Sequence, residues 1–113
     1  MQFRIVEAGP ALRRVELSGR LDVAGAEALE APLTRDLAAL RCAVLLDITA
    51  VSFVGSLGIR VLVGAARQMK RQGHRLALYG ANAVVQEVFH TVALDQLIPI
   101  AADEAAARAL LRA

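Results

Sequence analysis

The chain of 113 residues is long enough for one domain, residues 1–113, and leaves little room for a second. Hydrophobic residues make up 57% of it and aromatic residues only 4%, which predicts a core of Leu, Val, Ile and Ala in layered helices and parallel strands. The formal net charge of +2, with arginines spread along the chain and no interleaved aromatic residues, argues against nucleic-acid binding.

The first third of the sequence predicts two strands followed by a helix. Residues 3–7 alternate between apolar and polar types, and a second strand resumes at 12–17 after the Gly9-Pro10 turn, so we expect an antiparallel hairpin. Asp22 is expected to cap the following helix. Pro32 predicts a kink in that helix or a start close to the proline. The apolar stripe of the helix comprises Leu29, Leu33, Leu37 and Leu40.

The middle of the chain predicts a central strand and a long amphipathic helix. Residues 43–46 are continuously apolar, which is typical of a strand covered on both faces, and Asp47 is expected to end it. Residues 48–55 then form a connection, and a helix runs from about Ser56 to Gln72 with Gly73 after it. We expect its buried side to hold Ile59, Leu62, Val63, Ala66 and Met69, and its solvent side Arg60, Arg67, Lys70 and Arg71.

The last third continues the alternation of strands and helices. Residues 75–79 predict a strand, Asn82 caps a short helix through His90, residues 97–100 predict an edge strand because they contain a proline, and Asp103 caps a final helix. The short helix is expected to turn inward Val84, Val85, Val88 and Phe89. Strands separated by helices predict an α/β fold, with a mixed, mostly parallel sheet of about five strands and about four helices.

The single cysteine and the apolar segments indicate the cellular compartment of the protein. Cys42 excludes a disulfide within the chain, and we interpret it as a small buried hydrophobic residue. The N-terminal residues lack the long apolar run of a signal peptide, and charges or glycines interrupt every apolar run well short of a membrane span. We therefore expect a soluble cytoplasmic domain without direct membrane insertion.

Ser56 stands at the junction between the predicted central strand and the next helix. Free backbone amides and the helix dipole favour negative charge there. A phosphate on Ser56 would add about −1.5 to −2 charges, which the helix start tolerates but a partner fitted to the bare hydroxyl rejects. Such a residue can change binding and leave the fold intact. A capping serine without any regulatory role is the alternative interpretation.

The chain offers little for catalysis. A nucleophile elbow needs Gly-x-Ser-x-Gly, and Val54 occupies the first glycine position before Ser56. Neither His74 nor His90 has an obvious acidic partner nearby in sequence to orient it, and two isolated histidines with one cysteine do not make a metal site. We expect no enzymatic activity, no metal and no cofactor.

The sequence resembles STAS domains and, among them, bacterial anti-sigma factor antagonists over almost the full chain, and three segments in register carry most of the resemblance. Residues 17–22, LSGRLD, resemble the family's Gly-x-Leu/Ile-Asp motif before its first helix. Residues 44–54 resemble its apolar strand, Asp-Leu-Ser turn and Val-x-Phe-Ile sequence. Residues 55–59, GSLGI, stand where the family carries Asp-Ser-Ser-Gly-Leu.

The resemblance implies partner switching. Such an antagonist binds an anti-sigma factor, usually a serine kinase of the histidine-kinase-like ATPase type, and thereby frees the sigma factor. The kinase phosphorylates the first serine of the motif, which is Ser56 here, and a phosphatase resets the system. We expect the partner to contact the junction and the exposed side of the next helix, through Asp22, Ser56, Gly58 and Arg60.

Two departures from the family pattern leave alternatives open. Gly55 replaces the acidic residue before the serine, and Leu57 replaces the second serine. These changes bear more on phosphorylation than on binding. They also motivate a second hypothesis, a STAS subunit of a lipid-transport ABC complex that binds its ATPase subunit constitutively. A ligand-binding or scaffolding STAS domain is a third hypothesis.

Overall fold

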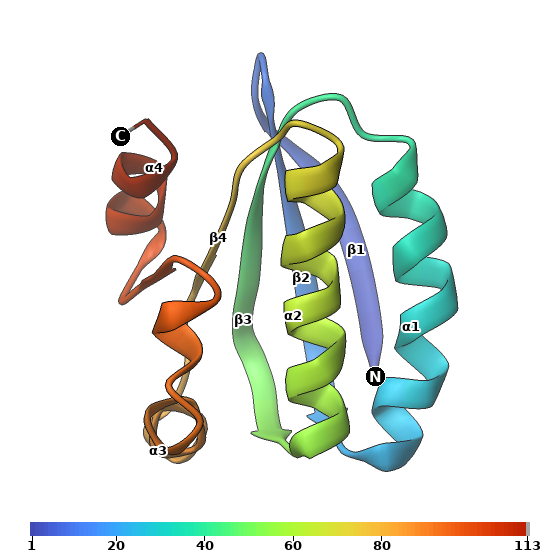
Figure 1. The fold of residues 1–113 in the computed structure, drawn as a ribbon, viewed down its shortest axis with the longest axis vertical. Coiled ribbons are helices and arrows are strands. Elements are labelled where there is room, and N and C mark those ends of the chain that lie inside the picture. The colour runs from blue at the N-terminus through green and yellow to red at the C-terminus, as the bar shows by residue number, and fades with distance from the viewer. Residues whose placement is uncertain (113) are drawn as a thin grey trace.

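The computed structural model describes residues 1–112, which form one five-stranded sheet with helices on both faces. The termini and the order of the elements can be followed in Figure 1. The elements are β1 (Gln2–Gly9), β2 (Leu12–Leu21), α1 (Val23–Ala38), β3 (Ala43–Val54), α2 (Ser56–Arg71), β4 (Leu76–Tyr79), α3 (Ala83–Thr91), the 3-10 helix η1 (Leu94–Gln96), β5 (Ile100–Ala101) and α4 (Glu104–Arg112).

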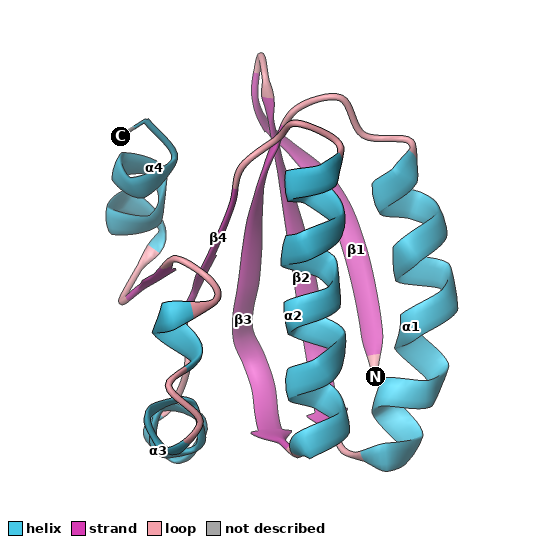
Figure 2. Cartoon of the chain, in the orientation of Figure 1, coloured by secondary structure: helices cyan, strands magenta, loops and turns pink. Residues whose placement is uncertain are grey.

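The strands lie in the sheet in their sequence order, β1-β2-β3-β4-β5. β1 and β2 are antiparallel, and each later pair is parallel. This confirms the predicted hairpin and the mixed, mostly parallel sheet. Figure 2 shows helices α1 and α2 side by side over the same part of the sheet. Each parallel pair is joined by a helix, as parallel pairing requires.

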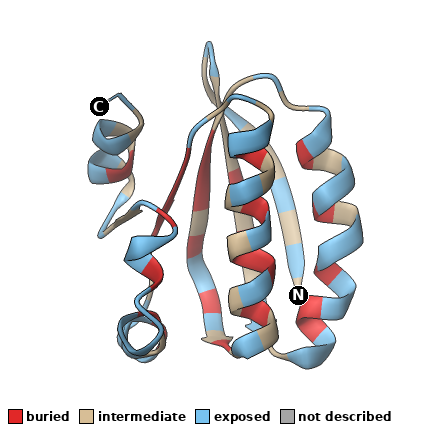
Figure 3. Ribbon diagram, viewed as in Figure 1, coloured by how far each residue is buried: buried red, intermediate tan, exposed pale blue. Residues whose placement is uncertain are grey.

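Alternate residues of the strands build two separate apolar layers. Val44 and Leu46 of β3 join the larger cluster, which includes the buried residues of α1, α2 and α3. Leu45 faces the other way and meets Tyr79 of β4 and Ala107 of α4 in a smaller cluster. Side chains alternate across a strand, so α4 covers the opposite face of the sheet from α1 and α2. Figure 3 shows the buried positions along the facing sides of these elements.

Strand β3 is longer than the sequence predicted. It continues through Asp47 to Val54 and remains paired with β2 as far as Leu21. Ile48, Val51 and Val54 are buried along this extension. The predicted connection at residues 48–55 is therefore wrong, because this segment gains ladder hydrogen bonds and a buried face that continue the strand.

Helix α1 begins at Val23, directly after its cap, and runs without interruption to Ala38. Of the two alternatives predicted at Pro32, the late start is wrong. Pro32 lies inside the helix and cannot donate to the carbonyl one turn earlier, that of Ala28. Ala28 is exposed, so water can satisfy that carbonyl group and the helix accommodates the proline.

The predicted faces of α2 are confirmed in part. Leu62 and Met69 are buried as predicted, whereas Ile59, Val63 and Ala66 are only half-buried. The side of the helix that meets the rest of the core is centred on the adjacent positions Val61 and Ala65 instead. The predicted solvent side is confirmed, since each of its four basic residues is exposed. The fully buried residues of α2 are Gly58, Val61, Leu62, Ala65 and Met69.

The end of α2 agrees with the sequence prediction, and the buried side of α3 agrees with it in part. The helix α2 ends as expected: Gly73 has φ +83°, with the His74 amide bonded to the Met69 carbonyl oxygen at 2.9 Å. In α3, Val85 and Phe89 are buried, but Val84 is 57% exposed because it falls on the outer side of the first turn.

The C-terminal edge of the sheet and Cys42 also differ from expectation. The final strand is Ile100–Ala101, which lies beyond most of the predicted 97–100 range. It is an edge strand, as the proline predicted. The 3-10 helix η1 uses the preceding residues and leaves Leu97 exposed. Cys42 is only half-buried, because it lies in the turn before β3 rather than within the strand.

Candidate functional site

The carboxyl ends of β2, β3 and β4 meet the first turns of α1, α2 and α3 at one end of the molecule, the lower end in Figure 1. Since β3 lies between β2 and β4, the start of α2 occupies the centre of this edge. The Gly55 amide donates to the Leu21 carbonyl oxygen at 2.9 Å and ties the β3–α2 junction to the end of β2. We call this surface the junction edge; it consists of the segments 20–23, 53–57 and 80–84.

Ser56 is the exposed first residue of α2 and does not cap it. The cap position belongs to Gly55, whose backbone is extended, with φ −99° and ψ −176°. Within residues 1–112, the Ser56 hydroxyl group makes no hydrogen bond to another residue. The interpretation of Ser56 as a structural capping residue is therefore wrong. Its hydroxyl group is presented to solvent at the positive end of the helix dipole.

Asp22 caps α1 as the sequence predicted. Its Oδ1 accepts a hydrogen bond from the Gly25 amide at 2.8 Å. This hydrogen bond, followed by the Arg20 guanidinium 3.5 Å from Oδ2, holds the pKa of the Asp22 carboxyl group below its ordinary value. The half-buried Asp22 therefore places a negative charge on the junction edge.

Gly58 is buried and allows α2 to approach the end of β2. A Cβ atom on Gly58 would lie 2.6 Å from the Leu21 Cγ and 2.7 Å from the Leu21 carbonyl oxygen. Only a residue without a side chain fits this contact. Gly58 thus determines where the junction edge lies, and its contact with a partner stays a prediction.

Arg60 is exposed on α2, one turn beyond Ser56. It lines a small hollow of about 150 Å³ between α1 and α2, together with Glu27 and Leu57. In the described part of the chain, Arg60 takes part in none of the ion pairs. The structure therefore places Ser56 and Arg60 on the same exposed side of α2.

The structure adds residues that the sequence analysis did not assign to the site. The Arg20 guanidinium carbon lies 4.7 Å from the centre of the Phe53 ring, which is cation–π contact. Arg20 and Phe53 are partners in the β2–β3 register, a relationship that no local pattern reveals. The same ring lies 3.4 Å from where a Cβ atom of Gly55 would stand, so a larger residue there would press on Phe53.

Two apolar side chains flank the start of α2. Val23 begins α1 and is 59% exposed, and Val84 lies in the first turn of α3. Their exposure next to the caps Asp22 and Asn82 gives the junction edge apolar surface on both sides of Ser56. The sequence signal was their position in the first turn after a cap, where a side chain often faces solvent.

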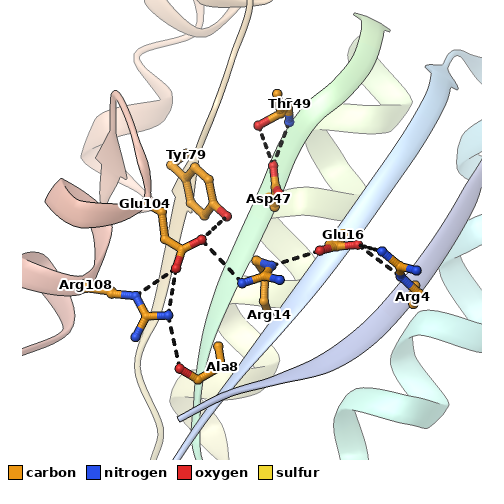
Figure 4. A network of polar contacts seen from close by, with 9 residues as sticks. All are labelled: Arg4, Ala8, Arg14, Glu16, Asp47, Thr49, Tyr79, Glu104 and Arg108. Atoms are coloured by element: carbon orange, nitrogen blue, oxygen red, sulfur yellow. Dashed lines mark hydrogen bonds and ion pairs between the residues drawn. The ribbon is translucent and has the colours of Figure 1, made fainter.

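The opposite face of the sheet holds a polar network that fixes α4 (Figure 4). Glu104 accepts hydrogen bonds from the Tyr79 hydroxyl group at 3.1 Å and from Arg108 at 2.7 Å. Burial, and next the nearby charge of Asp47, raise the pKa of Tyr79, whereas the hydrogen bond from Arg108 lowers the pKa of Glu104. The network extends through Arg14 to Glu16 on β2 and from there to Arg4 on β1. It is a structural clamp away from the junction edge.

The described residues contain no cluster of three or more His, Cys, Asp or Glu side chains arranged to hold a metal ion. Over the same residues, no helix combines the length and the apolar character needed to span a bilayer.

Comparison with known proteins identifies the family. The sequence profile of the STAS domain matches residues 4–107. A Bordetella bronchiseptica protein, provisionally named anti-sigma factor antagonist BtrV, is 30% identical over 96 residues, which cover 85% of this chain and 83% of BtrV.

Solved structures share the fold. An anti-sigma factor antagonist from Mycobacterium paratuberculosis aligns with a TM-score of 0.85 and 22% identity, over 99% of this chain and 94% of that one. The antagonist SpoIIAA in its unphosphorylated form gives a TM-score of 0.74 at 20% identity, over 96% of both chains. Phosphorylated SpoIIAA from Bacillus gives 0.67 at 20% identity, over 96% of this chain and 99% of that one.

The five-stranded mixed sheet with its helices is thus the STAS fold that the sequence predicted. The profile match and the BtrV relationship agree with it. The chain belongs to the STAS domain family and is an anti-sigma factor antagonist-like protein, a regulator and not an enzyme.

Proposed function

We propose that the protein works by partner switching. It binds an anti-sigma factor kinase through the junction edge, and phosphorylation of Ser56 by that kinase ends the complex. The observation that carries the proposal is the position of Ser56: exposed, first in α2, and free of a capping role because Gly55 caps the helix. A phosphatase would restore binding, and the cycle would take place in the cytoplasm.

The local chemistry supports a switch that spares the fold. A phosphate on Ser56 would face the free amides at the start of α2, where an anion is favoured by roughly 0.3–1 kcal/mol. The first turn of α2 contains no acidic residue that would oppose the phosphate. A partner surface packed on the bare hydroxyl group would have to desolvate a dianion, which costs far more.

The junction edge also offers surface suited to a protein partner. The exposed Val23 and Val84 supply apolar area on either side of Ser56. Arg20, held over Phe53, and the ionised Asp22 supply opposite charges close by. Interfaces with an apolar centre and a charged rim are typical of regulatory protein complexes.

Two other hydroxyl groups near the site have structural partners. The Thr49 hydroxyl group donates to the Asp47 carboxylate at 2.6 Å, and the Ser52 hydroxyl group donates to the Gly19 carbonyl oxygen at 3.4 Å. These contacts support Ser56 as the preferred phosphoacceptor. They also make Ser52→Ala a matched control, because Ser52 is exposed near the same edge.

The test uses the anti-sigma factor kinases of the source genome, each purified and incubated with the protein and ATP. Intact-mass spectrometry should detect one phosphate on the wild type and on Ser52→Ala, and none on Ser56→Ala. Equal labelling of Ser56→Ala would refute the proposed phosphorylation site. Constitutive copurification with a transporter ATPase and permease, unaffected by Ser56→Ala, would support the lipid-transport alternative instead.

A further inference from the structure

Helix α2 presents a basic surface that begins at Ser56. Residues 56, 60, 64, 67 and 71 follow one another at intervals of three or four, so they lie along one side of the helix. Each of the five is exposed. We call the residues beyond Ser56, together with the adjoining Lys70, the basic stripe; it comprises Arg60, Gly64, Arg67, Lys70 and Arg71.

The basic residues of the stripe form no ion pair within the described residues. The sequence of α2 contains no aspartate or glutamate. None of the ion pairs of residues 1–112 uses a basic residue of α2, whereas arginines elsewhere pair with carboxylates. Arg4 with Glu16 and Arg108 with Glu104 are examples. Four exposed cations on one helix side thus remain available to an external anionic group.

The shape of the basic stripe allows a partner to approach helix α2 closely. A Cβ atom on Gly64, at the middle of the stripe, would have open space around it, with nothing within 4 Å apart from its own stretch of helix backbone. Beside it, a groove of about 460 Å³ runs between α1 and α2 and is lined by Gly64, Gln68 and Arg71. A partner backbone can therefore reach α2 with little steric hindrance.

The residues of the basic stripe and its surroundings favour a protein, rather than a membrane or a nucleic acid, as the partner that binds the stripe. The large exposed hydrophobic residues of the described chain lie outside α2, so the stripe has no apolar side chain to insert into a bilayer. The helix also lacks an aromatic residue for base stacking. Glu30 lines the opposite wall of the groove and would repel a continuous polyanion, whereas discrete carboxylates can avoid it.

We propose that the basic stripe docks an acidic surface of the partner protein, and that phosphorylation of Ser56 acts on the same stripe. This inference rests on the proposed partner-switching function. Ser56 and Arg60 are one turn apart, so a phosphate on Ser56 draws Arg60 into an intramolecular pair. The phosphate also repels the partner's carboxylates. The first turn of α2 contains no acidic residue, so the phosphate would be the only negative group on that turn of the helix.

The first experiment measures the dissociation constant of the purified kinase for two charge-reversal variants. Arg67→Glu with Arg71→Glu alters the stripe at a distance from Ser56. Arg41→Glu with Arg112→Glu is the matched control, because it changes the net charge equally and both arginines are exposed outside α2. The Kd of the kinase for the stripe variant should be at least ~10-fold higher than for the wild type and should depend less on salt concentration. The Kd for the control variant should stay within about twofold of the wild-type value.

An equal effect of the two double variants would overturn the inference and leave the proposed function standing. Failure of every kinase to bind the wild type would refute the proposed function, and a second experiment then decides the inference alone. In it, a decaglutamate peptide is titrated into isotope-labelled protein and followed by amide NMR shifts. Shifts along residues 60–71 that diminish in Ser56→Glu support the docking surface.

The same titration includes vesicles of phosphatidylglycerol and a short DNA duplex as competing anionic ligands. The inference predicts that the peptide binds the stripe more tightly than either of them at physiological salt. Tighter binding of the vesicles or the duplex through residues 60–71 would show that the stripe serves a membrane or a nucleic acid. An absence of peptide-induced shifts on α2 would also contradict the inference.

Discussion

Gly58 of α2 lies against Leu21 at the end of β2, so closely that a Cβ atom would stand 2.7 Å from the Leu21 carbonyl oxygen. This contact brings the start of α2 to the centre of the junction edge. Gly58→Ala should lower the free energy of unfolding by about 1–3 kcal/mol, because the backbone of β2 cannot yield as a flexible side chain could. Urea denaturation measures this loss.

Gly64 provides the matched comparison on the same helix. Open space surrounds its missing Cβ atom. Gly64→Ala should raise the free energy of unfolding by roughly 0.5–1 kcal/mol, because alanine loses less backbone entropy than glycine in a helix. If the two alanine variants had the same stability, the close contact at Gly58 would not be the reason for glycine there.

Asp22 should contribute to the pH dependence of stability. Its pKa lies below the ordinary value of 3.8, first because the Gly25 amide donates to the carboxylate. A folded-state pKa below the unfolded one gives stability that is present above the unfolded pKa and is lost as the pH falls through the folded value. Asp22→Asn keeps an oxygen acceptor but has no charge to titrate. Thermal unfolding between about pH 5 and pH 2 should therefore show a smaller loss for the variant than for the wild type.

Glu104 should hold α4 on the sheet. Its carboxylate accepts hydrogen bonds from Tyr79 and Arg108 and is about one-third exposed. Glu104→Ala should cost about 1 kcal/mol after screening by solvent, and it should speed amide hydrogen exchange in α4 more than in α2. Glu7→Ala, at an 82% exposed side chain, serves as the control and should change neither measurement. A uniform increase in exchange over both helices would contradict a local clamp.

Features set by local chemistry could be predicted from the sequence. Asp22, Asn82 and Asp103 cap their helices through hydrogen bonds to amides three residues on. Gly73 ends α2 in a left-handed conformation. In each case a single residue type satisfies free backbone groups nearby, so the neighbouring sequence is sufficient.

The course of β3 could not be predicted in the same way. Its buried residues Ile48, Val51 and Val54 are three apart, because the register with β2 shifts twice along this stretch. These irregularities remove the period of two by which a strand is detected. Tertiary pairing with β2, which is distant in sequence, determines the strand.

The sequence predicted Ser56 as the main residue of the candidate site but did not predict the Arg20–Phe53 contact beside it. The family pattern located Ser56, but glycine and serine both occur at helix caps, so the sequence could not assign the cap to Gly55. Arg20 meets Phe53 across 33 residues of sequence through the sheet register. Such a contact follows from the pairing of strands and from no local motif.

The central claim is that a phosphate on Ser56 controls partner binding. The most direct measurement is the dissociation constant of one anti-sigma factor kinase for two forms of the protein, unphosphorylated and stoichiometrically phosphorylated at Ser56, by isothermal titration calorimetry. Desolvation of the dianion and repulsion from an acidic partner predict binding at least ~100-fold weaker for the phosphorylated form. Equal affinities for the two forms, with both folded by circular dichroism, would contradict the account.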